Sequence, residues 1–206
     1  MDSWLLFHSK AKKSNEPMPS NAARILSNFS LLDVSYQDKT YRSIEHVYHA
    51  SKFSYRRNGD ARSDLVEEIR NLSSPQEAKV AGGKKGMKKR GVELDVELFD
   101  SVRDDIMKSL VKDKITRHSE VQDILRKSKE EKIELLHHSR SDMYWGCHVD
   151  NETGQIRKGR NRLGEIYMEF IEQGLHSNVK PELSQSLPLK RSSDIELMHK
   201  TAKKKM

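Results

Sequence analysis

Cysteine is almost absent from this chain of 206 residues, and its scarcity sets the first limits on function. Cys147 is the single cysteine, which excludes an intramolecular disulfide and an all-cysteine zinc site. This composition is typical of a reducing compartment, so we expect a cytoplasmic protein. No apolar run approaches the roughly 18 residues of a membrane-spanning helix. Residues 1–7 lack both a basic segment and a long apolar one, so we expect no secretory signal there.

Positive charge exceeds negative charge by +7, but the excess is unevenly spread. Residues 176–206 hold seven Lys or Arg and three Asp or Glu, whereas residues 21–175 are nearly neutral. We therefore expect a weakly ordered segment over 1–20, a folded domain over 21–175 and a basic, disordered tail over 176–206. The tail either binds nucleic acid or an acidic partner, with a nuclear location then also open, or is merely solvated.

Periodicity and capping signals predict a mainly helical body with a little β-structure, that is, a single α+β domain that is predominantly α-helical. Ser43 can cap a helix that continues to about Tyr55, and residues 74–77 and 119–122 both read as capping boxes. Further helices are expected near 60–71, near 95–113 and over 163–173, the last ending at Gly174. Residues 34–42 favour a hairpin that turns at 38–39, and residues 133–136 form either a strand or a helix end.

One predicted helix carries a polar stripe between apolar flanks. At about 100° per residue, Glu45, His49 and Lys52 share one face of the helix. The stripe either lines a site, with Glu45 favoured as an anion near the helix N-terminus, or forms a solvent-facing set of pairs. His46 and His49 lack the spacing and companions of a metal site, so no metal is expected.

Three other segments stand out chemically. Residues 142–146 (Asp-Met-Tyr-Trp-Gly) indicate either an aromatic wall beside a backbone bend or a core tryptophan with a turn glycine. Asn161 is a candidate N-cap, and the basic residues around it would hold an anion such as phosphate at the start of the last helix. The basic run over 84–90 lacks interleaved aromatic residues, and we interpret it as a solvated face.

Together these segments resemble the NADAR family, also called YbiA-like N-glycosidases. The resemblance covers about residues 24–173. The matching motifs are Leu26-Ser27-Asn28-Phe29-Ser30, Ser43-Ile44-Glu45-His46 with Ala50-Ser51-Lys52-Phe53, Ser74-Pro75 with Ala78-Lys79, Arg103 with Met107, Asp142-Met143-Tyr144-Trp145-Gly146, and Gly159-Arg160-Asn161-Arg162-Leu163-Gly164.

The resemblance implies a compact, largely helical domain that hydrolyses an N-glycosidic bond between ribose and a base-like nitrogen. The implied substrates are ribosylamino-pyrimidine phosphates of riboflavin synthesis or ADP-ribose attached to a nucleobase, with no cofactor. The implied catalytic residues are Glu45, Asp142 and Lys52. The substrate-binding residues that we expect are Asn28, Phe29, His49, Phe99, Arg103, Trp145, Gly146 and Asn161.

Each catalytic residue has an expected role. Glu45 would stabilise positive charge on the ribose and activate water, and Asp142 would orient ribose hydroxyls or share proton transfer. Lys52 would contact a phosphate, lower a neighbouring pKa, or attack C1′ as an amine. Trp145 and Phe99 would stack the base.

Two positions depart from the family pattern. Phe99 stands where many members have tryptophan, and His137 where many have glutamate. These departures keep a second interpretation open, in which the chain is a non-catalytic module that binds ADP-ribose or nucleic acid.

Truncating the chain after residue 176 should leave the hydrolysis of a small soluble substrate unchanged. If the substrate is a modified nucleic acid, the truncation should weaken its binding and flatten the log–log salt dependence, since each phosphate contact contributes about −0.9 to the slope on duplex DNA. Affinity for a ribosylated oligonucleotide at several salt concentrations, with and without the tail, measures this. An unchanged slope would remove the tail from any account of function.

Overall fold

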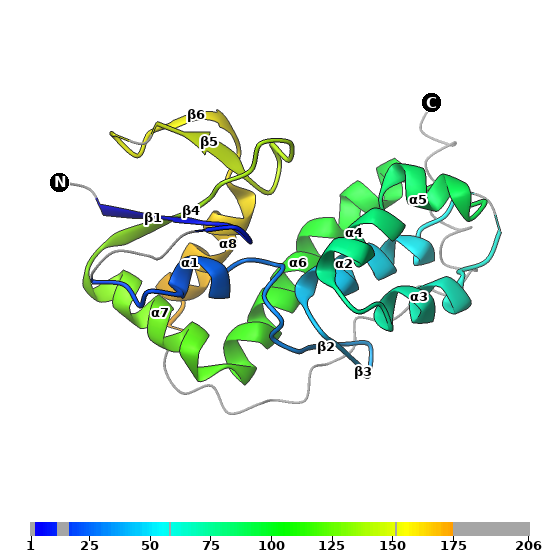
Figure 1. The fold of residues 1–206 in the computed structure, drawn as a ribbon, viewed down its shortest axis with the longest axis horizontal. Helices are drawn as coiled ribbons and strands as arrows, with labels where there is room; N and C mark the ends of the chain where they lie inside the picture. The colour runs from blue at the N-terminus through cyan, green and yellow to red at the C-terminus, as the bar shows by residue number, and fades with distance from the viewer. Residues whose placement is uncertain (1–2, 12–16, 58, 151, 175–206) are drawn as a thin grey trace, which may run out of the picture.

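The computed structural model describes residues 3–11, 17–57, 59–150 and 152–174. Over these ranges the chain is predominantly helical, with short strands paired in two-stranded sheets, which confirms the expected fold class (Figure 1). The elements in chain order are β1 (Ser3–Phe7), α1 (Ala22–Ile25), β2 (Val34–Tyr36), β3 (Lys39–Tyr41), α2 (Ile44–Ser51), the 3-10 helix η1 (Lys52–Ser54), α3 (Ser63–Arg70), α4 (Pro75–Ala81), α5 (Lys84–Lys89), α6 (Val96–Arg117), α7 (Ser119–Glu130), β4 (Ile133–His137), β5 (Cys147–Val149), β6 (Ile156–Gly159) and α8 (Arg162–Glu172).

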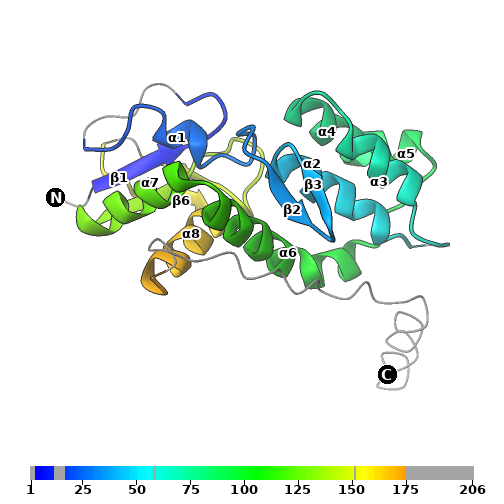
Figure 2. The same cartoon turned by 90° about the horizontal axis from the view of Figure 1, so that it is seen from below.

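Helix α6 is the long element that connects the two halves of the molecule. Its 22 residues span about 33 Å. It begins at Asp95, whose side chain accepts a hydrogen bond from the Leu98 amide at 3.1 Å. Figures 1 and 2 show α2–α5 with β2 and β3 towards one end of α6, and β1, β4, α7 and α8 towards the other. One continuous hydrophobic core joins both halves.

The N-terminal segment contradicts the expectation of weak order over residues 1–20. Ser3–Phe7 forms β1, which pairs in parallel with β4 from Ser3 opposite Ile133 to Phe7 opposite His137. Leu5 and Phe7 are buried, so alternate residues of β1 face the core. The partner strand lies about 130 residues later in the chain. No local sequence signal predicts a pairing between segments so far apart. Residues 12–16 lie outside the described ranges.

The local signals had mixed outcomes. Ser43 caps α2, and Ser74 with Glu77 forms the expected capping box of α4. The capping box at Ser119 is wrong: the extended residue His118 occupies the N-cap position, and Ser119 is already helical. Residues 133–136 belong to strand β4.

The hairpin forms, but it turns one residue earlier than expected. Tyr36 pairs with Lys39, which leaves Gln37 and Asp38 as the turn. Both have positive φ, 50° and 59°, as a type I′ hairpin turn requires.

Asn161 holds the start of α8 against β4 rather than capping the helix. It occupies the N-cap position with φ of 55°, but its side chain makes no cap hydrogen bond. Instead its Oδ1 accepts from the His137 amide at 2.7 Å, and its Nδ2 donates to the Leu135 carbonyl at 3.0 Å. Asn161 therefore joins two elements that are far apart in the sequence.

Gly174 follows α8 with φ of 76°, as expected of a C-terminal cap. Within the ranges that the structure describes, no helix has the length and apolar character needed to cross a membrane. The tail over 176–206 lies outside the described residues, so its expected disorder and binding stay predictions.

Asn161→Ala should lower the free energy of unfolding by about 2–4 kcal/mol. The change leaves one buried amide and one buried carbonyl without partners and adds the strain of a left-handed alanine. Urea denaturation followed by circular dichroism measures the loss. Asn161→Gly is the matched control, because it loses the same hydrogen bonds without the strain and should be about 1 kcal/mol less destabilised. Parent-like stability in both variants would contradict this role.

Candidate active site

The first turn of α2 places a carboxylate in the protein interior. The Ser43 hydroxyl caps the helix by accepting from the His46 amide, and the Glu45 amide donates to the Asn28 carbonyl at 3.1 Å. Glu45 is only 6% exposed. A buried carboxylate needs compensating partners, and the partial positive charge of the helix N-terminus supplies part of that compensation.

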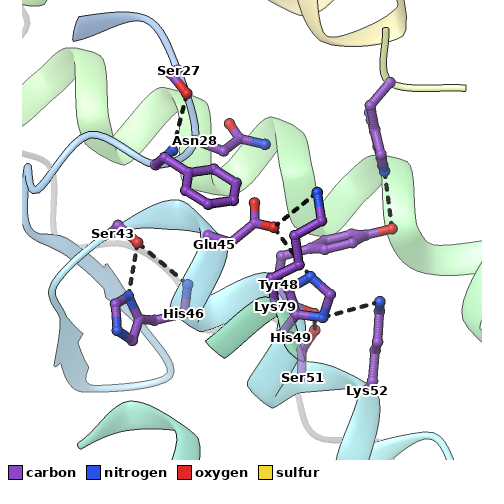
Figure 3. Close-up of polar contacts among 12 residues, drawn as sticks. Ser27, Asn28, Ser43, Glu45, His46, Tyr48, His49, Ser51, Lys52 and Lys79 are labelled. Atoms are coloured by element: carbon purple, nitrogen blue, oxygen red, sulfur yellow. Dashed lines mark hydrogen bonds and ion pairs between the residues drawn. The ribbon is translucent and has the colours of Figure 1, made fainter. Parts of the chain in front are cut away.

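The polar stripe of α2 is a buried chain of contacts, and its solvent-facing interpretation is wrong. His49 Nε2 lies 3.2 Å from Glu45 Oε1, and Lys52 Nζ lies 3.3 Å from His49 Nδ1 (Figure 3). His49 is buried, and Lys52 is partly buried. We call Glu45, His49 and Lys52 the α2 relay. The helical spacing that puts three side chains on one face also puts them in contact.

The direction of each hydrogen bond follows from the donors available. The ammonium form of Lys52 has three hydrogens and no lone pair, so it donates to His49 Nδ1. A neutral His49 then carries its proton on Nε2 and donates it to Glu45. Lys52 thereby fixes both the orientation and the tautomer of the imidazole that faces the carboxylate.

Burial lowers the pKa of Lys52 from 10.5 to about 8. The negative charges of Glu45 and Asp142 oppose that shift, and the positive charge of Lys79 adds to it. Lys52 is therefore within electrostatic reach of both expected catalytic carboxylates. With this pKa, about one tenth of the amine is unprotonated at pH 7.

A second lysine, from α4, approaches the same carboxylate. Lys79 Nζ lies 3.9 Å from Glu45 Oε1 (Figure 3). It also lies 5.3 Å from the ring centroid of Phe29. The Lys79 side chain is 49% exposed, so it stands at the border between the buried relay and solvent. Phe29 is partly buried and lines this side of the site.

Asp142 lies in the turn that leads to β5. Its Oδ1 accepts from the amides of Tyr144 and Trp145 at 3.1 and 3.0 Å, which fixes the turn. Its charge acts on Lys52 and also on His137, whose pKa is lowered by burial. Asp142 thus belongs to the same charged cluster as the relay, with one oxygen committed to the turn.

The aromatic residues form a packed layer beneath the relay. Tyr48 contacts Phe99 and Trp145, with ring centroids 5.5 and 5.7 Å apart, and its hydroxyl accepts from Trp145 Nε1 at 2.9 Å. Phe99 is 3% exposed and Trp145 is 4% exposed. Neither presents an open ring face, so the expected stacking of a base on these two rings is not what the structure shows; both rings instead support Tyr48.

Asn28 reaches into the site with an oxygen that has no hydrogen-bond partner among the residues that the structure describes. Its Nδ2 donates to Met107 Sδ at 3.7 Å, while its buried Oδ1 accepts no hydrogen bond from the described residues. An unsatisfied buried acceptor costs about 1–3 kcal/mol. A ligand hydroxyl or amine would satisfy it.

Arg103 packs against Tyr144, next to the aromatic layer. Its guanidinium stacks on Tyr144, 3.6 Å from the ring centroid, and pairs with Asp100 at 2.8 Å. A cavity of about 520 Å³ lies beside this stack, lined by Asp104, Tyr144, Arg160, Arg162 and Glu165. Arg162, at the start of α8, is paired with Asp104, Glu165 and Glu169. The anion expected at this helix start would have to compete with those carboxylates.

Two expected substrate-binding residues have structural roles. Gly146 is buried, and a Cβ there would lie 2.5 Å from Ser139 Cβ and 2.9 Å from the His137 carbonyl. Asn161 is 3% exposed, and both polar atoms of its side chain bind the backbone of β4. Close packing in one case and hydrogen bonding to the backbone in the other give both residues a structural role, and their expected role in substrate binding stays a prediction.

Sequence reasoning gave no role to Lys79, Tyr48 or His137 in the site. Tyr48 lies on the apolar face of α2, and Lys79 reaches Glu45 only because α4 packs on α2. His137, from β4, donates from Nδ1 to the Trp145 carbonyl at 3.1 Å. The only signal for Lys79 was its place in a family motif. Among the described residues, no cluster of His, Cys, Asp and Glu side chains is suited to a metal ion.

Comparison with known proteins gives a consistent result. A family model described as NADAR domain matches residues 7–173. N-glycosidase YbiA of Escherichia coli (strain K12) is 31% identical over 150 residues, which cover 71% of this chain and 79% of that protein. N-glycosidase Npun_R5314 of Nostoc punctiforme is 29% identical over 147 residues, covering 71% and 83%.

The fold also resembles a solved structure. The NMR structure of the E. coli protein YbiA matches with a TM-score of 0.60 and 26% identity, over 90% of this chain and 93% of that chain. The chain therefore spans most of the length of the proteins it resembles.

Lys52 should titrate with a midpoint near pH 8, below the ordinary lysine value of 10.5. ¹³C-dimethyl labelling followed by NMR titration measures this midpoint. In Glu45→Gln the midpoint should move lower still, because the carboxylate charge that favours the ammonium is gone. A Lys52 midpoint at the ordinary lysine value of 10.5 would show that the amine is solvated rather than buried in the relay.

Proposed function

This chain belongs to the NADAR domain family, and on that premise we propose that the α2 relay is the catalytic centre of an N-glycosidase. The chain is a hydrolase that acts on N-glycosyl bonds, like the relatives that carry this name. The observation that carries the assignment of the centre is the burial of Glu45 in contact with His49, with Lys52 behind it. A charged chain of this kind inside a core is costly to maintain for structure alone.

Glu45 supplies what cleavage of a ribose–nitrogen bond needs. As that bond breaks, positive charge develops on the ribose, and an anionic carboxylate nearby stabilises it. The same carboxylate can take the proton of the attacking water. His49 and Lys79 both approach Oε1, which leaves Oε2 for water or substrate.

Asp142 and Asn28 are assigned to the sugar. Asp142 holds its turn through Oδ1, so Oδ2 is the oxygen that would accept from ribose hydroxyls. Asn28 Oδ1 offers a second acceptor in the same region and has no partner among the described residues. Two fixed acceptors can orient a ribose relative to Glu45.

Lys52 has two features that suit it to this chemistry. Its hydrogen bond fixes the tautomer of His49, so that the imidazole donates to Glu45 and keeps its orientation. Its lowered pKa also provides a fraction of free amine at neutral pH, which an attack on C1′ of an opened sugar would require.

We propose that the substrate is a ribosyl compound, either a ribosylamino-pyrimidine phosphate or ADP-ribose on a nucleobase. The exposed ammonium of Lys79 at the edge of the relay suits a negatively charged substrate of either kind. The alternative is a non-catalytic module of the same fold that binds ADP-ribose or nucleic acid. The intact α2 relay favours catalysis, since binding alone does not need a buried carboxylate held by an oriented imidazole.

Glu45→Gln should keep the fold and ligand binding while lowering hydrolysis at least about 10²–10³-fold, the scale of losing a positioned acid–base group. The amide is nearly isosteric but can neither accept the proton of water nor stabilise a cation as an anion does. Release of base by the purified variant, followed by chromatography, measures the loss.

Glu97→Gln is the matched control, because Glu97 also lies in the first turn of a helix but is exposed. It should retain full activity. Near-normal turnover by a folded Glu45→Gln protein would rule out Glu45 as the catalytic carboxylate.

A further inference from the structure

Helix α5 displays four lysines on one face. Its sequence is Lys-Lys-Gly-Met-Lys-Lys, and at 100° per residue the lysines occupy an arc of about 140° opposite Gly86 and Met87. Gly86 and Met87 are buried, whereas all four lysines are exposed. We call Lys84, Lys85, Lys88 and Lys89 the α5 lysine face.

The α5 lysine face is held rigidly against α4. A Cβ at Gly86 would lie 2.2 Å from the carbonyl oxygens of both Val80 and Ala81, so α5 packs directly on the backbone at the end of α4. Figures 1 and 2 place the two helices side by side. This close packing holds the helix that carries the four lysines in place against α4.

The charges of this face are not neutralised within the described part of the protein. No acidic side chain among the described residues lies within ion-pair distance of any of the four lysines. The nearby carboxylates are already engaged, Glu68 with Arg90 and Glu77 with the Ser73 and Ser74 amides. Lysines at i and i+4 also repel each other, so the arrangement weakens the helix that carries it.

The face is connected to the catalytic centre through α4. Lys79, on the helix against which α5 packs, stands at the edge of the relay with its ammonium 3.9 Å from Glu45. Lys79 therefore lies on the helix that joins the catalytic centre to α5.

We propose that the α5 lysine face binds the phosphodiester backbone of a nucleic acid. Helix α5 is about 9 Å long, and a duplex strand presents two or three phosphates over that length. An anionic membrane is a poorer match, because a membrane-binding helix needs large apolar residues beside its lysines, and those of α5 are buried or absent. That the bound strand carries a glycosyl group to Glu45 rests on the proposed function; the binding surface itself does not.

The test replaces all four lysines with glutamine, which removes the charge and keeps helix propensity. Fluorescence anisotropy with a short unmodified duplex, at several salt concentrations, should show weaker binding and a log–log slope about two units flatter than that of the parent. Thermal stability should stay equal or rise slightly, since the repulsion is relieved. Turnover of a small ribosylated substrate should not change.

The matched control replaces Lys112, Lys127, Lys129 and Lys132. Lys112 lies near the end of α6, Lys127 and Lys129 lie in α7, and Lys132 follows α7. Figures 1 and 2 show α7 at the opposite end of the molecule from α5. This control removes the same net charge, and it should keep most of the parent slope. An unchanged slope in the α5 variant, or an equal loss in the control, would overturn the proposal. Loss of binding to phosphatidylserine vesicles without loss of duplex binding would overturn it in favour of a membrane.

A folded parent that binds duplex through α5 but hydrolyses no ribosyl substrate would refute the proposed function and leave the surface standing. Normal hydrolysis of a small substrate, with no effect of the α5 variant on duplex binding, would refute the α5 binding surface and leave the proposed function standing.

Discussion

The burial of the Glu45 carboxylate is the constraint on which the rest of the site depends. A charge in a core must be compensated, and here the helix N-terminus, the His49 imidazole and the Lys79 ammonium share that task. These contacts in turn require further contacts around them. His49 needs Lys52 to hold its tautomer, and Lys52 is held over the rings of Tyr48 and Phe99. The aromatic layer that sequence patterns assign to the substrate is thereby used to support the relay.

The surrounding fold maintains that arrangement through contacts between residues far apart in the sequence. The Asn28 loop binds the start of α2 through the Glu45 amide. The same loop is held by Lys114 of α6, whose buried ammonium donates to the carbonyls of Ile25 and Ser27 and to the Ser30 hydroxyl. Asn161 also ties α8 to β4, and His137 of β4 binds the Trp145 carbonyl beside Asp142. The two carboxylates of the site thus come from opposite halves of the molecule.

Much of this could be predicted from local sequence signals, because those signals arise from short-range physics. The caps at Ser43 and Ser74 and the helical face of Glu45, His49 and Lys52 follow from spacing of four residues or fewer, whereas local pattern left residues 133–136 open between a strand and a helix end. The features that local signals did not predict depend on long-range contacts. The pairing of β1 with β4, the burial of Phe99, and the use of Asn161 as a tie are decided by residues far away in the chain. The same long-range packing selects the core tryptophan from the two interpretations of residues 142–146. Lys79 is in the site only because α4 packs on α2, and no periodicity in either helix encodes that contact.

The central claim is that the buried relay of α2 breaks a ribose–nitrogen bond. Its most direct test is to incubate the purified full-length chain separately with a ribosylamino-pyrimidine phosphate and with an oligonucleotide that carries ADP-ribose on guanine, and to separate the products by chromatography. The account predicts release of the base, or of the ribosyl group, from at least one of the two. A folded protein that binds one of the compounds but releases neither base nor ribosyl group from either compound would contradict it. That result would identify the chain as a binding module that retains the fold without the reaction.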